Sequence, residues 1–233
     1  MNVRIRSDFR EYYDHAFDLS GMEWFRNSED DLSRSSAHNR MRNMGLNVPR
    51  SGLLNNRKLL REMGNIQVVV YTNEYTHRGE GKLLLQLEEA MVDYPGCYAS
   101  AYIHRPVAYS QPSSVRRLRI GSSIHWLEYW SEDTWRSNYS TVDAPVDIYT
   151  YVPGITANII DYEPYPMLAI DFVESIYGAW YAIDYNTSPG IGGTPIEGIL
   201  TPNDIYKEVA NWMDERYDEY HTNVEHLREI REE

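Results

Sequence analysis

Two apolar runs around a short turn constrain the fold of this chain more than any other feature of its sequence. The runs 167–173 and 179–185 have the composition of buried β-strands, and the turn between them contains Gly178. We therefore expect residues 167–185 to form a β-hairpin. A hairpin of this kind requires a fold with at least one antiparallel sheet.

Three polar side chains are set into this predicted hairpin. Asp184 and Asn186 are two residues apart, so they share one face of a strand. Asp171 lies in the first run and would project beside them if the two runs pair. An acidic side chain in a buried run is costly unless it is paired or bound to a cation. Two carboxylates and an amide oxygen on one face favour a Mg²⁺ site; the alternative is a hairpin whose polar face is exposed to water.

Charge and cysteine content exclude several classes of protein. The chain has 22 Lys and Arg against 35 Asp and Glu, a formal charge of −13, which disfavours a general nucleic-acid binder. Cys97 is the only cysteine, so no internal disulfide is possible and a reducing compartment is expected. The sequence contains no signal peptide, membrane-length apolar run, zinc-type histidine spacing, G-x-S-x-G elbow or P-loop. We therefore expect a cytoplasmic protein.

The remaining segments alternate between helical and strand patterns, which predicts an α+β fold dominated by antiparallel hairpins. A capping box at Thr201 and Asp204 predicts where the last helix begins. The expected elements are a helix from Ser7, a helix over 33–44 that ends at Gly45, a strand over 66–71, a helix over 83–92, a strand over 98–103, a hairpin of 115–120 with 124–130, and a last helix from 201 to Leu227.

Two loops contain groups that could hold an anion. In the first loop, backbone N–H groups beside glycines could approach a phosphate, although an ordinary connecting loop fits equally well. In the second, Arg136 is flanked by Trp135 and followed by Asn138, so it could clamp an anion or simply stack on the tryptophan. The candidate phosphate-covering residues of the first loop are His77, Arg78, Gly79, Gly81 and Lys82.

Taken in order, these segments resemble the ATP-grasp superfamily over roughly residues 33–213. The final motif is the most specific: Asp171 … Asp184-Tyr-Asn186-Thr-Ser-Pro189-Gly190 is similar to the family signature Asp … Glu-x-Asn-x-x-Pro-Gly. Three other segments match more loosely. Met44-Gly45-Leu-Asn-Val-Pro49 is similar to the family's Gly-x-x-x-Pro turn at the end of a helix, and residues 68–81 are similar to its strand and glycine-rich lid loop. Arg119-Ile-Gly-Ser-Ser-Ile, followed by Trp135-Arg-Ser-Asn138, is similar to its strand pair and the loop that bears Arg and Asn.

The resemblance implies an ATP- and Mg²⁺-dependent ligase that joins a carboxylate to an amine through an acylphosphate. The carboxylate would belong to a small molecule or a peptide. The fold implied is ATP-grasp-like, with two small lobes of antiparallel sheet and packed helices: 1–32 as an N-terminal extension, 33–110 as the lid or small lobe, and 111–233 as the C-terminal lobe with the metal-binding hairpin and terminal helix. The roles implied are Mg²⁺ ligation by Asp171, Asp184 and Asn186, phosphoryl contact by Arg136 and Asn138, and a triphosphate cover from residues 77–82.

The sequence departs from the family pattern at two site positions. Asp184 stands where most members have Glu, and Tyr71 stands where a lysine usually ends the strand before the lid, with Lys82 as a candidate substitute. Residues 1–32 leave no room for the usual N-terminal substrate domain, and they resemble segments of phage-encoded proteins, which would imply the host cytoplasm. One alternative is therefore a degenerate ATP-grasp fold that acts as a nucleotide-binding or protein-interaction module without catalysis. Another is a structural phage component with no ligand.

Overall fold

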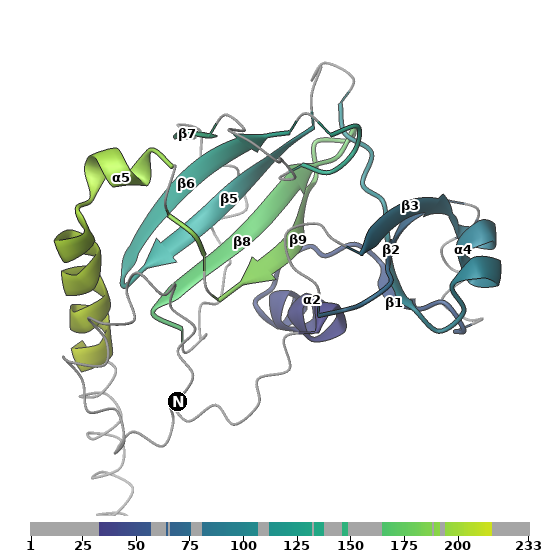
Figure 1. Ribbon diagram of the computed structural model, residues 1–233, viewed down its shortest axis with the longest axis horizontal. Coiled ribbons are helices and arrows are strands. Elements are labelled where there is room, and N and C mark those ends of the chain that lie inside the picture. Colours follow the sequence, from purple (N-terminus) through teal and green to yellow (C-terminus); the bar gives the residue numbers. More distant parts are fainter. Residues whose placement is uncertain are drawn as a thin grey trace, which may run out of the picture.

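The computed structural model describes residues 33–56, 64, 66–75, 81–106, 112–131, 133–137, 165–187, 189–191 and 194–215, together with the backbone of 146–148. These residues form two antiparallel sheets with helices, which confirms the α+β class (Figure 1). In chain order the elements are α2 (Arg34–Asn43), β1 (Ser51–Leu53), β2 (Gln67–Tyr71), β3 (Lys82–Gln86), α4 (Leu87–Asp93), β4 (Tyr98–Ala101), β5 (Ser113–Ile120), β6 (Ser123–Trp130), β7 (Val146–Ile148), β8 (Met167–Glu174), β9 (Trp180–Asn186) and α5 (Ile196–Ile199), followed by a helix over 202–215.

The two sheets differ in size and occupy different parts of the molecule, as Figure 1 shows. The small sheet has the strand order β1-β4-β2-β3, and the large sheet has the order β7-β6-β5-β8-β9. The predicted hairpins β5–β6 and β8–β9 are both present. The helix predicted from Ser7 and the last helix beyond residue 215 lie outside the described residues. None of the described helices is both long and apolar enough to span a membrane.

Helix α2 has the ends that the sequence predicts. The Ser33 hydroxyl caps its N-terminus by accepting a backbone N–H. At the C-terminus Gly45 adopts a φ of 79°, its N–H donates to the Arg42 carbonyl at 2.9 Å, and the Leu46 N–H donates to the Met41 carbonyl at 3.0 Å. This is a Schellman motif, which only glycine forms without strain at that φ.

The helix predicted over 83–92 is wrong in its first half. Residues 82–86 form strand β3, which pairs with β2 so that Tyr71 lies opposite Lys82, and α4 begins only at Leu87. A run of leucines fits a helix or a strand equally well, and pairing with β2 decides between them here. The glycine-bearing loop therefore joins two antiparallel strands, and the Thr72 N–H donates to the Gly81 carbonyl across its base at 2.8 Å.

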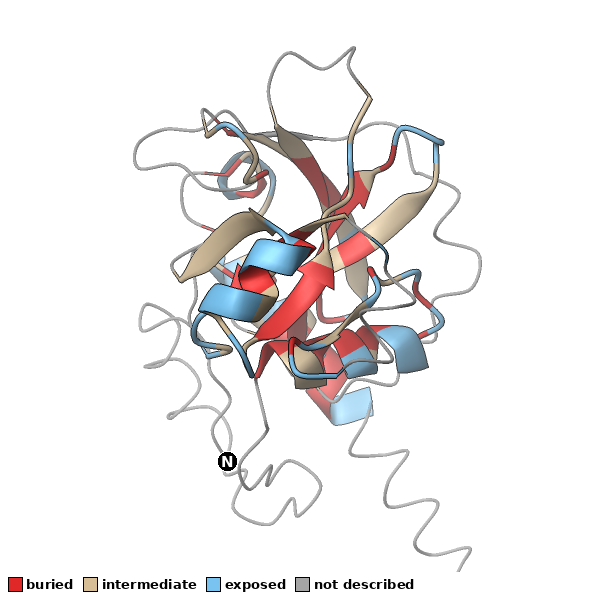
Figure 2. Ribbon diagram, turned by 90° about the vertical axis from the view of Figure 1, so that its right-hand side faces the viewer, coloured by how far each residue is buried: buried red, intermediate tan, exposed pale blue. Residues whose placement is uncertain are grey.

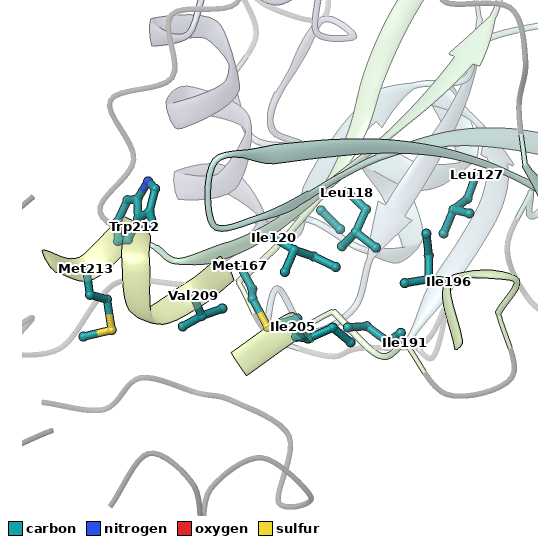
Figure 3. Close-up of a cluster of buried hydrophobic side chains, with 11 residues drawn as sticks. Leu118, Ile120, Leu127, Met167, Ile191, Ile196, Ile205, Val209, Trp212 and Met213 are labelled. Atoms are coloured by element: carbon teal, nitrogen blue, oxygen red, sulfur yellow. The ribbon is translucent and has the colours of Figure 1, made fainter. Parts of the chain in front are cut away.

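Each sheet has its own hydrophobic core. The small sheet packs against α4, whose outer surface is exposed (Figure 2). One face of the large sheet packs against α2, although α2 precedes the small sheet in the chain. The other face packs against α5 and the 202–215 helix (Figure 3). This last core consists of Leu118, Ile120, Leu127, Met167, Ala169, Ile191, Ile196, Ile205, Val209, Trp212 and Met213.

The small sheet is a contiguous insertion between α2 and the large sheet. It occupies residues 51–101, and its two ends meet, because the Ala101 N–H donates to the Arg50 carbonyl at 2.8 Å. None of the residues that the structure describes in this segment belongs to either core of the large sheet. The two sheets therefore have separate cores.

The 202–215 helix begins with the predicted capping box. The Asp204 N–H donates to Thr201 Oγ1 at 3.2 Å, and the Thr201 N–H donates to Asp204 Oδ2 at 3.0 Å. This helix lies against the β5–β6 turn, where Gly121 has a φ of 56°. A Cβ at this position would lie 2.2 Å from the Glu208 carbonyl oxygen, so the close approach requires glycine.

Candidate functional site

A cavity of about 660 Å³, part of it open to solvent, lies where the small sheet faces the large sheet. Strands β2 and β4 line one side, and β8 and β9 line the other. Its apolar part contains Val69, Ile103, Val173 and Ile183. Its polar part contains Tyr71, His38, Lys82, Arg136 and Asp184.

The β8–β9 hairpin brings the three predicted metal ligands to one face. Asp171 and Asp184 are register partners across the two strands, and Asn186 follows on the same face of β9, opposite Ala169. A register shift occurs between Asp171 and Phe172, immediately after the paired carboxylates. Asp171 is only 1% exposed.

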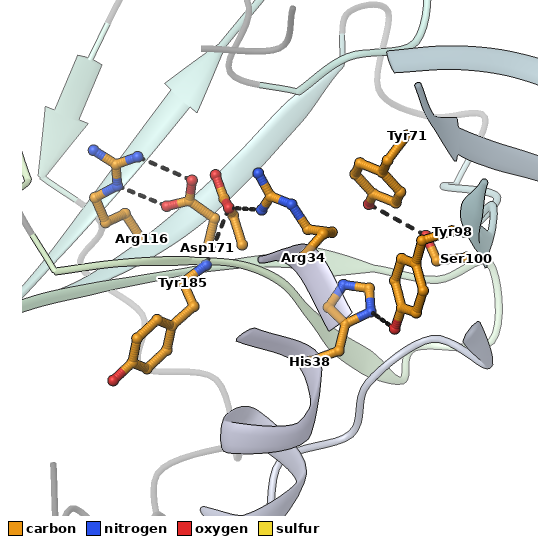
Figure 4. A network of polar contacts seen from close by, with 9 residues as sticks. Arg34, His38, Tyr71, Tyr98, Ser100, Arg116, Asp171 and Tyr185 are labelled. Carbon is orange, nitrogen blue, oxygen red and sulfur yellow. Dashed lines mark hydrogen bonds and ion pairs between the residues drawn. The ribbon is translucent and has the colours of Figure 1, made fainter. Parts of the chain in front are cut away.

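Asp171 is held by Arg116 from the neighbouring strand β5. Arg116 Nε donates to Asp171 Oδ1 at 2.6 Å and Nη2 donates to Oδ2 at 2.9 Å, a bidentate pair shown in Figure 4. The guanidinium also lies 4.6 Å from the centre of the Tyr129 ring. Burial alone would lower the pKa of Arg116, but the Asp171 carboxylate more than offsets it, so this pKa is raised. The Arg116 guanidinium is therefore charged within the fold.

Asp184 is held by Arg34, which lies in the first turn of α2. Arg34 Nη1 donates to Asp184 Oδ1, which also accepts the Tyr185 N–H at 3.1 Å. Burial would raise the pKa of Asp184, but Arg34 and then Lys82 outweigh it, so this pKa is lowered and the carboxylate stays ionised. The Arg34 guanidinium lies 5.3 Å from the centre of the Tyr71 ring, at the boundary between the two sheets.

Lys82 is the one predicted lid residue whose side chain the structure brings to the carboxylates. Its ammonium lies 5.9 Å from the centre of the ring of Tyr71, its partner on β2. Burial lowers the pKa of Lys82, while Asp184 acts to raise it. Gly81 precedes it at the base of the loop with a φ of 63°. His77, Arg78 and Gly79 lie outside the described residues.

Arg136 lines the cavity and also stacks on Trp135, so the two interpretations of this loop are compatible. Its guanidinium lies 4.7 Å from the centre of a Trp135 ring, and Nη1 donates to Asp133 Oδ2 at 2.7 Å. Nη2 donates to the Lys82 carbonyl at 3.0 Å, which links the loop after β6 to the small sheet. Asn138 lies outside the described residues.

His38 is a site residue that the sequence analysis missed, together with Arg34 and Arg116. It is fully buried, and its Nδ1 lies 3.0 Å from Tyr98 Oη and 3.2 Å from Ser51 Oγ (Figure 4). Burial, with help from nearby arginines, lowers the pKa of His38 to about 3, so its imidazole is neutral. The available signal was the spacing of Arg34 and His38, which places them on one face of α2.

Comparison with solved structures identifies the architecture. N5-carboxyaminoimidazole synthetase from Staphylococcus aureus, complexed with ADP, matches with a TM-score of 0.51 and 14% identity, over 71% of this chain and 47% of that chain. The ATP-grasp ligase PsnB, complexed with a minimal precursor, matches with a TM-score of 0.52 and 12% identity, over 79% of this chain and 60% of that chain. The fold is that of the ATP-grasp ligases. The chain thus spans about half to three fifths of the length of these two proteins.

The ATP-grasp resemblance seen in the sequence is confirmed at the level of the fold. No protein-family model matches the sequence, and no curated protein matches it. The likeness to solved ATP-grasp structures therefore shows the fold alone.

The oxygen donors of Asp171, Asp184 and Asn186 are of the type that a hard cation prefers. Within the described part of the chain, no group of three or more His, Cys, Asp or Glu side chains could hold a metal. The candidate set differs because it combines two carboxylates, Asp171 and Asp184, with the amide of Asn186. Each carboxylate is paired with an arginine, but a carboxylate has about four acceptor positions and can also bind a metal.

Proposed function

We propose that this chain binds ATP with Mg²⁺ in the cleft between its sheets and uses it to join a carboxylate to an amine. The observation that carries the proposal is the convergence of opposite charges beside the cavity, where Lys82 and Asp184 belong to its lining. The charged groups are Asp171, Asp184, Arg34, Arg116 and Lys82. The likeness in fold to a synthetase complexed with ADP and to the ligase PsnB supports a nucleotide as the occupant.

The two ends of the cavity suit the two ends of a nucleotide. The apolar side chains Val69, Ile103, Val173 and Ile183 would pack against the base. At the polar end, Lys82 and Arg34 would neutralise phosphate oxygens. The lid residues His77, Arg78, Gly79 and Gly81 would cover the triphosphate from the loop between β2 and β3.

The metal-binding residues would be Asp171, Asp184 and Asn186. A Mg²⁺ ion held there would neutralise charge on the phosphates. Asp184 keeps the charge of the glutamate that is usual at this position in the family. Lys82 is the candidate substitute for the lysine that Tyr71 replaces, because it lies directly opposite Tyr71 on β3 and interacts electrostatically with Asp184.

The protein would contribute positioning and charge neutralisation, with no covalent step on the enzyme. An oxygen of the substrate carboxylate attacks the γ-phosphorus of ATP, and ADP leaves. The amine nitrogen would then attack the acyl carbon, and the amide bond would form as phosphate leaves and the nitrogen gives up a proton to the departing phosphate or to water. Arg136 and Asn138 would stabilise the phosphoryl group during the first step. The carboxylate would belong to a small molecule or a peptide, and the use of ATP fits a cytoplasmic location.

Nucleotide binding is the first test. Calorimetry should detect binding of the non-hydrolysable analogue AMPPNP with Mg²⁺ to the wild-type protein. Lys82→Met and Asp184→Asn should each weaken it by about tenfold or more, which corresponds to about 1.4 kcal/mol. Arg42→Ala, an exposed change on the same helix as Arg34, serves as the matched control and should leave binding unchanged. Equal affinity in all four proteins would exclude the cleft as the nucleotide site.

Catalysis is tested at Arg136. Near a transferring phosphoryl group its contribution is expected in turnover more than in affinity. Arg136→Ala should therefore keep an affinity for Mg·ATP within about tenfold of the wild type, which corresponds to about 1.4 kcal/mol. It should nevertheless lose nearly all ADP release in a screen of carboxylates and amines. A wild-type protein that binds ATP but releases no ADP with any mixture would favour the second candidate, a nucleotide-binding module. The observation that favours the nucleotide-binding module is the presence of Tyr71 at the position that a lysine usually occupies.

A further inference from the structure

We propose that Arg34 is the resident counter-ion of Asp184, so that a divalent metal enters this site only together with a polyphosphate. The inference rests on the proposed nucleotide site and deepens it. It concerns how metal and nucleotide depend on one another, and it assigns the dependence to one residue on α2.

The two ion pairs at the site differ in how firmly they are fixed. Arg116 holds Asp171 with two hydrogen bonds, and the Asp171 side chain is only 2% exposed. The Asp184 side chain is 23% exposed and faces the cavity, and its partner Arg34 comes from a different element, helix α2. The Arg34–Asp184 pair is therefore the one that an incoming ligand can reach and rearrange.

The charge balance around the carboxylates opposes a bare metal ion. Three basic side chains, Arg34, Arg116 and Lys82, interact electrostatically with the two carboxylates Asp171 and Asp184, so basic groups outnumber acidic groups by one in this cluster. Interactions at such short range inside a protein are several times stronger than in bulk water. A free divalent cation would either bind beside the positively charged Arg34 or displace it from Asp184 and leave that guanidinium buried without its carboxylate partner, and both are costly.

A polyphosphate changes this balance because it offers Arg34 a replacement partner. The guanidinium contacts Tyr71 and Asp184, and both of these residues line the cavity in which the phosphates would lie. Phosphate oxygens accept hydrogen bonds from arginine as well as carboxylates do. Transfer of Arg34 from Asp184 to a phosphate leaves Asp184 available to a metal that arrives with the nucleotide. Metal and nucleotide should therefore bind with positive coupling.

The test uses Mn²⁺ as a spectroscopic probe and requires no turnover. Electron paramagnetic resonance measures Mn²⁺ bound in the absence of nucleotide to the wild type, Arg34→Gln, Arg34→Lys and the control Arg42→Gln. Arg34→Gln should bind Mn²⁺ about tenfold more tightly than the wild type, whereas Arg34→Lys and Arg42→Gln should resemble the wild type. The gain should vanish when Asp184→Asn is combined with Arg34→Gln.

A second measurement separates this role from a loss of fold. Calorimetry with AMPPNP in the presence of a chelator should show about tenfold weaker binding to Arg34→Gln than to the wild type. One variant would then gain metal affinity and lose nucleotide affinity, whereas a misfolded protein would lose both.

The outcomes distinguish this inference from the proposed function. The counter-ion role would be overturned if Arg34→Gln shows no higher affinity for Mn²⁺ than the wild-type protein in the absence of nucleotide. If AMPPNP binds to none of the proteins while Arg34→Gln still gains Mn²⁺ through Asp184, the nucleotide function fails and the counter-ion role of Arg34 stands.

Discussion

His38 is a titratable side chain with no access to solvent, and it makes the stability of the fold depend on pH. Its pKa is lowered to about 3 by burial and by Arg34 and Arg42, against about 6.5 in an unfolded chain. Between these values the unfolded chain binds a proton that the folded chain does not bind. The contribution of His38 to stability is therefore fully present above about pH 6.5 and is lost as the pH falls toward 3.

We predict that the free energy of unfolding falls by up to about 1.4 kcal/mol per pH unit from this residue in that range. Urea denaturation at pH 7, 6, 5 and 4 should show a shallower decline for His38→Gln than for the wild type. The comparison between the two proteins removes the contribution of His125, whose pKa burial also lowers. Parallel curves would contradict the role assigned to His38.

The pair Arg116–Asp171 gives a second prediction at the scale of single residues. Arg116→Ala leaves the buried Asp171 carboxylate without its bidentate partner, and such a loss costs about 3–5 kcal/mol. Chemical denaturation should show a loss of this size, whereas Arg42→Ala, on the exposed side of α2, should change stability by less than about 0.5 kcal/mol. Exchange of both partners for leucine should restore much of the stability. A single-variant loss below about 1 kcal/mol would show that the pair is not buried in solution.

The β5–β6 turn depends on one glycine, and this gives a prediction at the scale of elements. Gly121→Ala places a Cβ 2.2 Å from the Glu208 carbonyl oxygen and adds the strain of a φ of 56°. We expect about 3 kcal/mol of destabilisation, measured by urea denaturation, because the turn must move away from the 202–215 helix. Gly198→Ala in α5, where a Cβ meets nothing within 4 Å, is the matched control and should be neutral or slightly stabilising. A stable Gly121→Ala protein would mean that this helix is not seated against the turn.

Elements specified by local sequence were predictable, and those specified by distant partners were not. Ser33 and Gly45 mark the two ends of α2, and the glycine turns mark the β5–β6 and β8–β9 hairpins. Strand β3 was mistaken for a helix because only its pairing with β2 distinguishes the two.

The same distinction holds at the site. Asp171 and Asp184 could be singled out because carboxylates are anomalous in apolar runs. Arg34 and Arg116 could not, because their importance arises from the approach of α2 to β9 and of β5 to β8, which no local pattern reveals.

At the scale of the whole molecule, the separate cores of the two sheets predict that one can fold without the other. Every residue of the small-sheet core lies within 51–101, and no described residue of this segment belongs to the two cores of the large sheet. A variant in which a short glycine-rich linker replaces 51–101 should retain near-UV circular dichroism and a cooperative thermal transition. Its midpoint should be lower, because His38 loses Ser51 and Tyr98. Nucleotide binding should be lost with Lys82, and a molten spectrum would refute the separation.

The meeting of the Ala101 N–H with the Arg50 carbonyl also bears on how such a gene can change. If recombination removes or replaces the segment between Arg50 and Ala101, the two flanking parts of the chain still end next to each other. We therefore expect that the coding region for 51–101 can be exchanged as one unit, which carries its own strands, its own helix and Lys82. The β8–β9 hairpin and its carboxylates would remain unchanged in such an exchange. Different small sheets could then be combined with one set of acidic residues.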